Sequence, residues 1–176
     1  GDDTPKLQGR NSLNPVVHID PIGFLMILVA GFGWAKPVQI DPDNFKNPRR
    51  DDILVALAGP AMNILVAIFF LLITKLIVTI PITGLDDNTY SILLLILDYV
   101  VWINIVLCVF NLIPIPPLDG SHIFFGLTGL KNTEVYYKLY QWSTLILLVL
   151  ILTNTLGKII IPAVNFIYSF LINIFF

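Results

Sequence analysis

Pro114-Ile115-Pro116-Pro117-Leu118-Asp119-Gly120 ends a long apolar run that begins near Tyr90. Its three prolines have no amide hydrogen to donate, so the backbone cannot continue there as a regular helix. Asp119 therefore follows a membrane-length segment on irregular backbone. A carboxylate taken out of water is costly and tends to have a partner, often a metal ion or a proton. We expect Asp119 to be one ligand of an intramembrane metal site whose other ligands lie mostly outside this chain.

The composition is that of a membrane protein. Of the 176 residues, 56% are hydrophobic and 12% are charged, with a mean hydropathy of +0.84, whereas an ordinary soluble domain is about 25% charged. The net charge of −2 gives no electrostatic support for a nucleic-acid partner. The single cysteine, Cys108, excludes an internal disulfide framework and a cysteine-rich zinc site.

Hydropathy divides one membrane domain, residues 1–176, into five segments. Residues 1–52 form a polar loop with a short apolar stretch at 22–32, which is too short to span a bilayer because a span needs about 20 residues. We expect transmembrane helices at 53–81, 90–113 and 140–161, with Asn154 and Gly157 as candidate break points in the last one. Residues 162–176 form a short span or an interfacial helix. The predicted fold is an all-α integral membrane bundle of about three to five helices, with a re-entrant or β-hairpin segment near its N-terminus.

Charged loops predict the orientation of this multi-pass protein. Basic residues favour the cytoplasmic side, and the loop directly before the first span contains four of them: Lys36, Lys46, Arg49 and Arg50. The second span then returns inward and brings Asp119 to the cytoplasmic side. Lys131 and Lys138 agree with this placement.

Polar residues within the second span allow two interpretations. Asn104 and Asn111 are seven residues apart and share one helix face that leads to Pro114. They either hold an extended peptide backbone in a catalytic groove or bond neighbouring helices, with Asp119 capping the next helix. Asp98 either relays protons or ions, or marks the effective start of the helix and reaches water by snorkelling. A small transporter or channel built on these residues is therefore a rival function.

Histidines are scarce in this chain. Hydrolytic zinc needs about three protein ligands and an open position, and the usual His-Glu-x-x-His motif does not occur in residues 1–176. Asp119 and His122 are three residues apart and could chelate a metal with His18 as the third ligand. We disfavour this self-contained site, because nothing in the sequence brings His18 near and no general base is evident.

Five blocks in order resemble the site-2 proteases, the M50 family of intramembrane zinc metalloproteases: LNPVVHIDPIG at 13–23, FGWAKPV at 32–38, NPRR at 47–50, LAGPAMN at 57–63 and FNLIPIPPLDG at 110–120. The resemblance covers residues 1–120 and implies that Asp119 is the third zinc ligand. It implies that Asn111 contacts the substrate or the tetrahedral intermediate, and that Asn63 lies on a helix beside the site. His18 and Asp20 fall in a block without a clear role, and His122 departs from the arginine that relatives often carry.

The same resemblance implies a zinc cofactor, a transmembrane protein substrate and a lipid bilayer as the surroundings. An extended substrate would pair with the segment around Trp34 by strand addition. The two zinc-binding histidines and the catalytic glutamate are expected on a helix immediately before Gly1. We therefore expect this chain to be a fragment that contains no catalytic residue and is inactive alone. The alternative is a catalytically inactive pseudoprotease that binds membrane helices.

Overall fold

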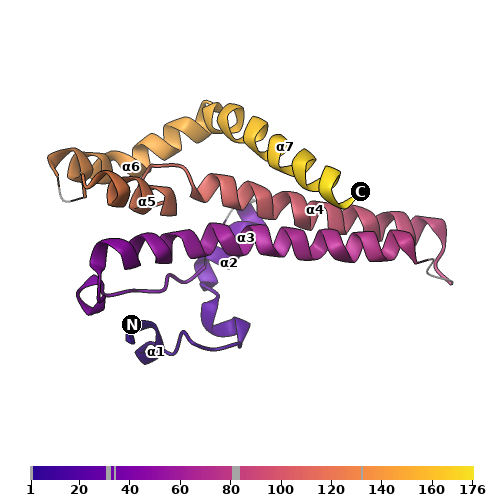
Figure 1. Cartoon of the computed structure of the whole chain (residues 1–176), viewed down its shortest axis with the longest axis horizontal. Coiled ribbons are helices and arrows are strands. Elements are labelled where there is room, and N and C mark those ends of the chain that lie inside the picture. Colours follow the sequence, from indigo (N-terminus) through magenta and orange to yellow (C-terminus); the bar gives the residue numbers. More distant parts are fainter. Residues whose placement is uncertain (1, 31–32, 34, 81–83, 132) are drawn as a thin grey trace. The chain divides into compact units, whose positions relative to one another are not determined.

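The computed structural model describes residues 2–30, 33, 35–80, 84–131 and 133–176 (Figure 1). The chain divides into two compact units, Gly1–Asp51 and Asp52–Phe176. The described residues are helical apart from loops and one isolated β-bridge. This confirms the all-α class, while the expectation of a single membrane domain stays a prediction.

The first unit contains four short helical elements. They are α1 (Thr4–Leu7), the 3-10 turn η1 (Pro15–His18), α2 (Pro21–Ala30) and the 3-10 turn η2 (Pro42–Asn44). The side chain of Asp20 caps α2, because its Oδ1 accepts hydrogen bonds of 2.9 Å from the amides of Ile22 and Gly23. The cap explains why a helix begins at Pro21.

The apolar stretch near the N-terminus is a helix and not a β-hairpin. The ten residues of α2 extend about 15 Å, half of a hydrocarbon core of about 30 Å. Ile19 and Ala35 form an antiparallel bridge, and the amide of Lys36 donates to the carbonyl of His18 at 2.9 Å. The chain therefore returns beside the start of α2, as a re-entrant or interfacial segment does. The β-hairpin alternative is wrong for the described residues.

The second unit contains most of the apolar helical residues. Its elements are α3 (Pro48–Thr79, whose first turn belongs to the first unit), α4 (Asp87–Asn111), α5 (Asp119–Thr128), α6 (Glu134–Leu152) and α7 (Thr155–Phe175). Among the described residues, α3, α4, α6 and α7 are long and apolar enough to cross a membrane. This number agrees with the predicted three to five spans.

The structure corrects the last part of the predicted segment map. A break at Asn154 divides the expected helix 140–161, and α7 begins at Thr155 and includes residues 162–176. Asn154 has a φ of 54°, a left-handed conformation that asparagine tolerates better than most residues. Pro162 lies inside α7 and removes one amide donor, but the helix continues past it to Phe175. Residues 162–176 are therefore part of a long helix.

The core of the second unit lies where α3, α4 and α7 meet. Its buried residues are Ala67 and Leu71 of α3, Val101 and Ile105 of α4, and Leu156, Ile160, Val164 and Leu171 of α7. Most other large apolar side chains of these helices are exposed, as expected for surfaces that face lipid. Because lipid tails are themselves apolar, close packing and hydrogen bonds hold such helices together.

Candidate metal and substrate site

The segment between α4 and α5 is a tight, irregular turn, as its prolines predict. The amide of Leu112 still bonds to the carbonyl of Cys108 at 3.1 Å, at the end of α4. The turn then closes with hydrogen bonds from Ile115 to Ile113 at 2.8 Å and from Leu118 to Ile115 at 3.0 Å. Asn111 is thus the last residue of α4, and Asp119 is the first residue of α5.

Gly120 allows α5 to approach the end of α4 closely. A Cβ atom at this position would lie 2.2 Å from the carbonyl oxygen of Leu112 and 2.6 Å from that of Ile113. No side chain fits in this space, so the contact requires glycine. The close contact fixes where α5 begins, and hence where Asp119 stands.

Asp119 is half-buried and its carboxylate lies against α3. A Cβ atom at Gly59 would lie 3.0 Å from Oδ2 of Asp119. Burial raises the pKa of the Asp119 carboxyl, and the positive charge of protonated His122 acts in the opposite direction. Leu118 is the N-cap of α5 and no side-chain cap hydrogen bond is formed to the first turn, so the alternative in which Asp119 caps this helix is wrong. Among the described residues no hydrogen bond to the Asp119 carboxylate is formed, which leaves its oxygens available to a ligand.

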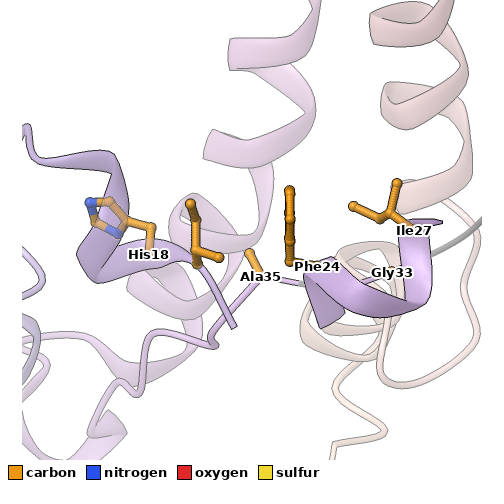
Figure 2. A pocket seen from close by; sticks show the side chains of 6 residues that line it. His18, Phe24, Ile27, Gly33 and Ala35 are labelled. Carbon is orange, nitrogen blue, oxygen red and sulfur yellow. The ribbon is translucent and has the colours of Figure 1, made fainter. Parts of the chain in front are cut away.

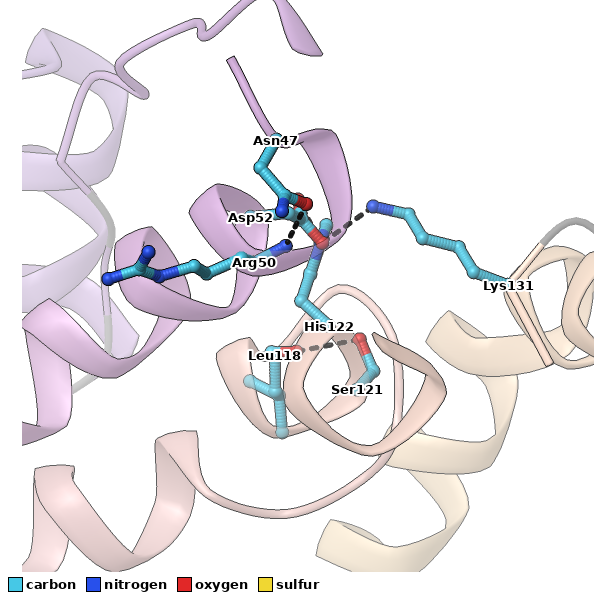
Figure 3. Close-up of polar contacts among 7 residues, drawn as sticks. All are labelled: Asn47, Arg50, Asp52, Leu118, Ser121, His122 and Lys131. Carbon is cyan, nitrogen blue, oxygen red and sulfur yellow. Dashed lines mark hydrogen bonds and ion pairs between the residues drawn. The ribbon is translucent and has the colours of Figure 1, made fainter. Parts of the chain in front are cut away.

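His122 has a different partner from the one the chelate hypothesis requires. Its Nδ1 lies 3.2 and 3.3 Å from the two carboxylate oxygens of Asp52, and Nζ of Lys131 lies 2.6 Å from Oδ2 of the same residue (Figure 3). In the first unit, Nε2 of His18 lies 2.9 Å from the carbonyl oxygen of Ser12. No group of three or more His, Cys, Asp or Glu side chains able to hold a metal occurs within the described ranges. Within the second unit, His122 therefore pairs with Asp52 and does not form the candidate chelate with Asp119.

The two asparagines of α4 differ in what they contact. Nδ2 of Asn104 donates to the carbonyl of Val100 at 2.8 Å, one turn earlier in the same helix. Asn104 therefore bonds its own helix, and among the described residues it forms no hydrogen bond to a neighbouring helix. Asn111 is half-buried at the end of α4, beside the turn that leads to Asp119. Asn63 of α3 is also half-buried and lies one turn after Gly59, on the same face of the helix.

Asp98 is well inside α4, which begins at Asp87. The hypothesis that the helix starts at Asp98 is therefore wrong. The hydroxyl of Tyr168 in α7 donates a hydrogen bond to Oδ1 of Asp98. This pair links two packed helices and lies apart from the Asp119 turn.

The first unit has a small apolar pocket of about 290 Å³, lined by His18, Ile19, Phe24, Ile27, Gly33 and Ala35 (Figure 2). A Cβ atom at Gly33 would lie 2.0 Å from the carbonyl oxygen of Gly23, so glycine is required where the chain returns past α2. Trp34, around which we expect the substrate to pair, lies outside the described residues.

Comparison with known proteins agrees with this geometry. The model of Peptidase family M50 matches residues 77–153. A protein named "Putative zinc metalloprotease YwhC" from Bacillus subtilis is 38% identical over 175 residues, covering 94% of this chain and 75% of that protein. No solved structure matches the chain.

Two proteins named "Putative zinc metalloprotease Rip2" are more distant relatives. The one from Mycolicibacterium smegmatis is 26% identical, covering 97% of this chain and 64% of that protein. The one from Mycobacterium tuberculosis is 28% identical, covering 89% of this chain and 59% of that protein. The four membrane-length helices among the described residues and these matches together indicate an integral membrane protein of the metalloprotease class. The chain belongs to peptidase family M50, and the resemblance to the site-2 proteases is confirmed.

Proposed function

We propose that this chain forms the part of a site-2-protease-like intramembrane metalloprotease that carries one zinc ligand and one substrate contact. Asp119 is the zinc ligand, and Asn111 is the substrate contact. The observation that carries the proposal is the position of the Asp119 carboxylate. It is half-buried against Gly59 of α3 and follows the turn at the end of the apolar helix α4. A carboxylate oxygen is an ordinary zinc ligand, and none of the described side chains uses it.

The donor set of the described residues fits zinc only in part. Asp119 supplies one anionic oxygen, whereas catalytic zinc takes about three protein ligands and keeps one position open. We place the two histidines and the general base in sequence that precedes Gly1 in the full-length protein. In support, the match to YwhC covers 75% of that relative, so part of it lies outside the match. Zinc held by this set would supply a bound water with a pKa of about 7 and a Lewis acid for the scissile carbonyl.

The residues of this chain bind and orient the substrate. In a helical substrate the backbone carbonyls are occupied by hydrogen bonds, so the peptide must be extended before it can react. The amide of Asn111 can donate to a substrate carbonyl and accept from a substrate amide. It would thus hold the extended backbone beside Asp119. The substrate is a transmembrane protein that enters from the bilayer.

The site is proposed to face the cytoplasm. Lys131 and Lys138 follow α5 in the sequence, and basic residues favour the cytoplasmic side of a membrane. A reporter cysteine just after α5, at residues 129–131, labelled by a membrane-impermeant reagent in intact cells and in inverted vesicles, would test this orientation. Labelling in intact cells alone would contradict it.

The zinc content of the full-length protein and its cleavage of a transmembrane reporter test the function. We expect Asp119→Ala to lose both zinc and cleavage. Asn111→Ala should keep zinc and slow cleavage about 10²–10³-fold, as the loss of one transition-state donor does elsewhere. Asp87→Ala, at the other end of α4, is the control and should behave as the parent protein does.

Each rival gives a different result. An inactive helix-binding relative would capture the reporter without cleaving it in the parent protein. A transporter would show ion flux that Asp98→Asn abolishes and Asp119→Asn spares. Zinc binding and cleavage that survive Asp119→Ala unchanged would remove Asp119 from the mechanism.

A further inference from the structure

Asp52 is a buried carboxylate that the proposed reaction does not use. The residue is 3% exposed and lies near the start of α3. Its carboxylate bonds to Lys131 at 2.6 Å and to His122 at 3.2 Å, and both of these side chains are about one-third exposed. Figure 3 shows the Asp52 carboxylate close to both side chains. A buried charge needs such partners, because removing one member of a buried ion pair leaves the other charge uncompensated.

The two partners of Asp52 lie within α5 and just after it, and α5 is the helix that begins with Asp119. His122 is on α5, three residues after Asp119 and thus one turn away. Lys131 follows α5 in the loop before α6. One carboxylate of α3 therefore holds α5 near its start and just past its end.

Two further contacts between α3 and α5 lie on the same interface. The Asp119 carboxylate is at Gly59, and a Cβ atom at Gly126 would lie 2.7 Å from Cγ1 of Ile53. Residue numbers fall along α3 as they rise along α5, so the two helices run antiparallel here. Van der Waals contacts at glycines are not directional, so the Asp52 pairs supply the directional contacts of this interface.

We propose that Asp52, through His122 and Lys131, is a positioning residue that sets the Asp119 carboxylate for metal binding. Asp52 does not touch the metal and acts only through the placement of α5. This inference rests on the proposed function, because it assumes that Asp119 is a metal ligand. It adds a residue on a different helix, 67 positions away in the sequence, to the determinants of that site.

Cobalt binding to the metal-free full-length protein in detergent tests this role. Asp52→Asn keeps the size of the side chain and removes its charge. We expect the dissociation constant for Co²⁺ to rise about 10–100-fold, the usual effect of losing a residue that orients a ligand, and the visible spectrum of bound Co²⁺ to change. Glu134→Gln is the matched control, because it removes an exposed carboxylate that pairs with Lys138 at 3.3 Å. It should bind Co²⁺ as the parent protein does.

A double variant separates positioning from general stability. If Asp52 acts through Asp119, Asp52→Asn with Asp119→Ala should bind Co²⁺ no more weakly than Asp119→Ala alone. If the double variant instead binds Co²⁺ more weakly than Asp119→Ala by the same factor that Asp52→Asn alone produces, the proposal is overturned. A folded Asp52→Asn protein with the parent affinity and spectrum would overturn it as well.

Hydrogen exchange gives a readout that needs no metal. Asp52→Asn should speed amide exchange in residues 119–131 and leave α7 unchanged. If the parent protein binds no Co²⁺, or Asp119→Ala binds it normally, the proposed function fails. In that case the exchange data alone decide whether Asp52 places α5, and unchanged exchange at 119–131 refutes it. Should Asp52→Asn not fold, Lys131→Met, which retains the His122 contact, is measured with the same outcomes.

Discussion

Gly120→Ala is expected to destabilise the protein, although alanine is the better helix former. Helix propensity alone would favour alanine by about 1 kcal/mol. The new Cβ atom would lie 2.2 Å from the carbonyl oxygen of Leu112, whereas ordinary contact begins at 3.4 Å. The shortfall is therefore 1.2 Å, and it is against backbone, which cannot rotate away as a side chain can. The start of α5 must move.

The magnitude follows from these two opposing effects. Overpacking a close contact costs about 1–3 kcal/mol, and more where backbone must shift. Because a clash with backbone belongs at the upper end of this range, we expect a net loss of about 2 kcal/mol in the free energy of unfolding. The shift also displaces Asp119, so Co²⁺ affinity should fall with stability.

Reversible unfolding of the full-length protein in detergent, followed by circular dichroism, measures this loss. The comparison is Gly59→Ala, where the nearest atom is the end of a side chain at 3.0 Å and the shortfall is only 0.4 Å. If Gly120→Ala proves as stable as the parent protein or more stable, the close approach of α5 to α4 is not as described.

Three further outcomes are expected. Gly59→Ala should change the free energy of unfolding by less than about 1 kcal/mol, because the gain in helix propensity offsets the crowding. It should nevertheless weaken Co²⁺ binding, because the new methyl group moves the Asp119 carboxylate. Unchanged Co²⁺ binding would show that the Asp119 carboxylate can accommodate this methyl group without moving. Ile105→Ala, at a fully buried site between α4 and α7, should cost about 2–5 kcal/mol in the same unfolding assay, and a value near zero would mean that these helices are not packed there. Asp86 caps α4 and accepts hydrogen bonds from the hydroxyl and the amide of Thr89, which lower the pKa of its carboxyl. The cap should stabilise α4 fully above the ordinary carboxyl pKa and be lost as pH falls through the lowered value. Amide exchange at the start of α4 should therefore rise only in acid, and Asp86→Asn should remove this pH dependence.

Local chemistry made much of the fold predictable. The prolines before Asp119 have the same effect in any context, so the irregular turn and the end of α4 could be predicted from sequence. Length and hydropathy likewise predicted the long helices. Asn154 was a visible break point, but Pro162 pointed to a boundary that does not exist. A proline inside a helix removes one hydrogen bond, and the remaining bonds of α7 carry the helix past Pro162.

The contacts around the candidate site were less predictable because they join distant parts of the sequence. The Asp52 pairs connect residues 70 and 79 positions apart, and no periodicity predicts such a pairing. The available signal was an acid at the start of a long apolar run, where an unpaired charge would be costly. Asn104 was misread for a different reason, since its amide reaches a carbonyl of its own helix and spacing alone cannot reveal this.

The hydrogen bond between Tyr168 and Asp98 has a consequence for how the last helix is seated. Apolar side chains such as Val101 and Val164 tolerate sliding, because a helix displaced by one residue still meets other apolar atoms. A hydroxyl aimed at one carboxylate does not, since a one-residue slip turns it by about 100° and lifts it by about 1.5 Å. The pair thus specifies the register of α7 against α4, as a single buried asparagine does in a coiled coil. Without it, α7 would have several nearly equivalent positions along α4.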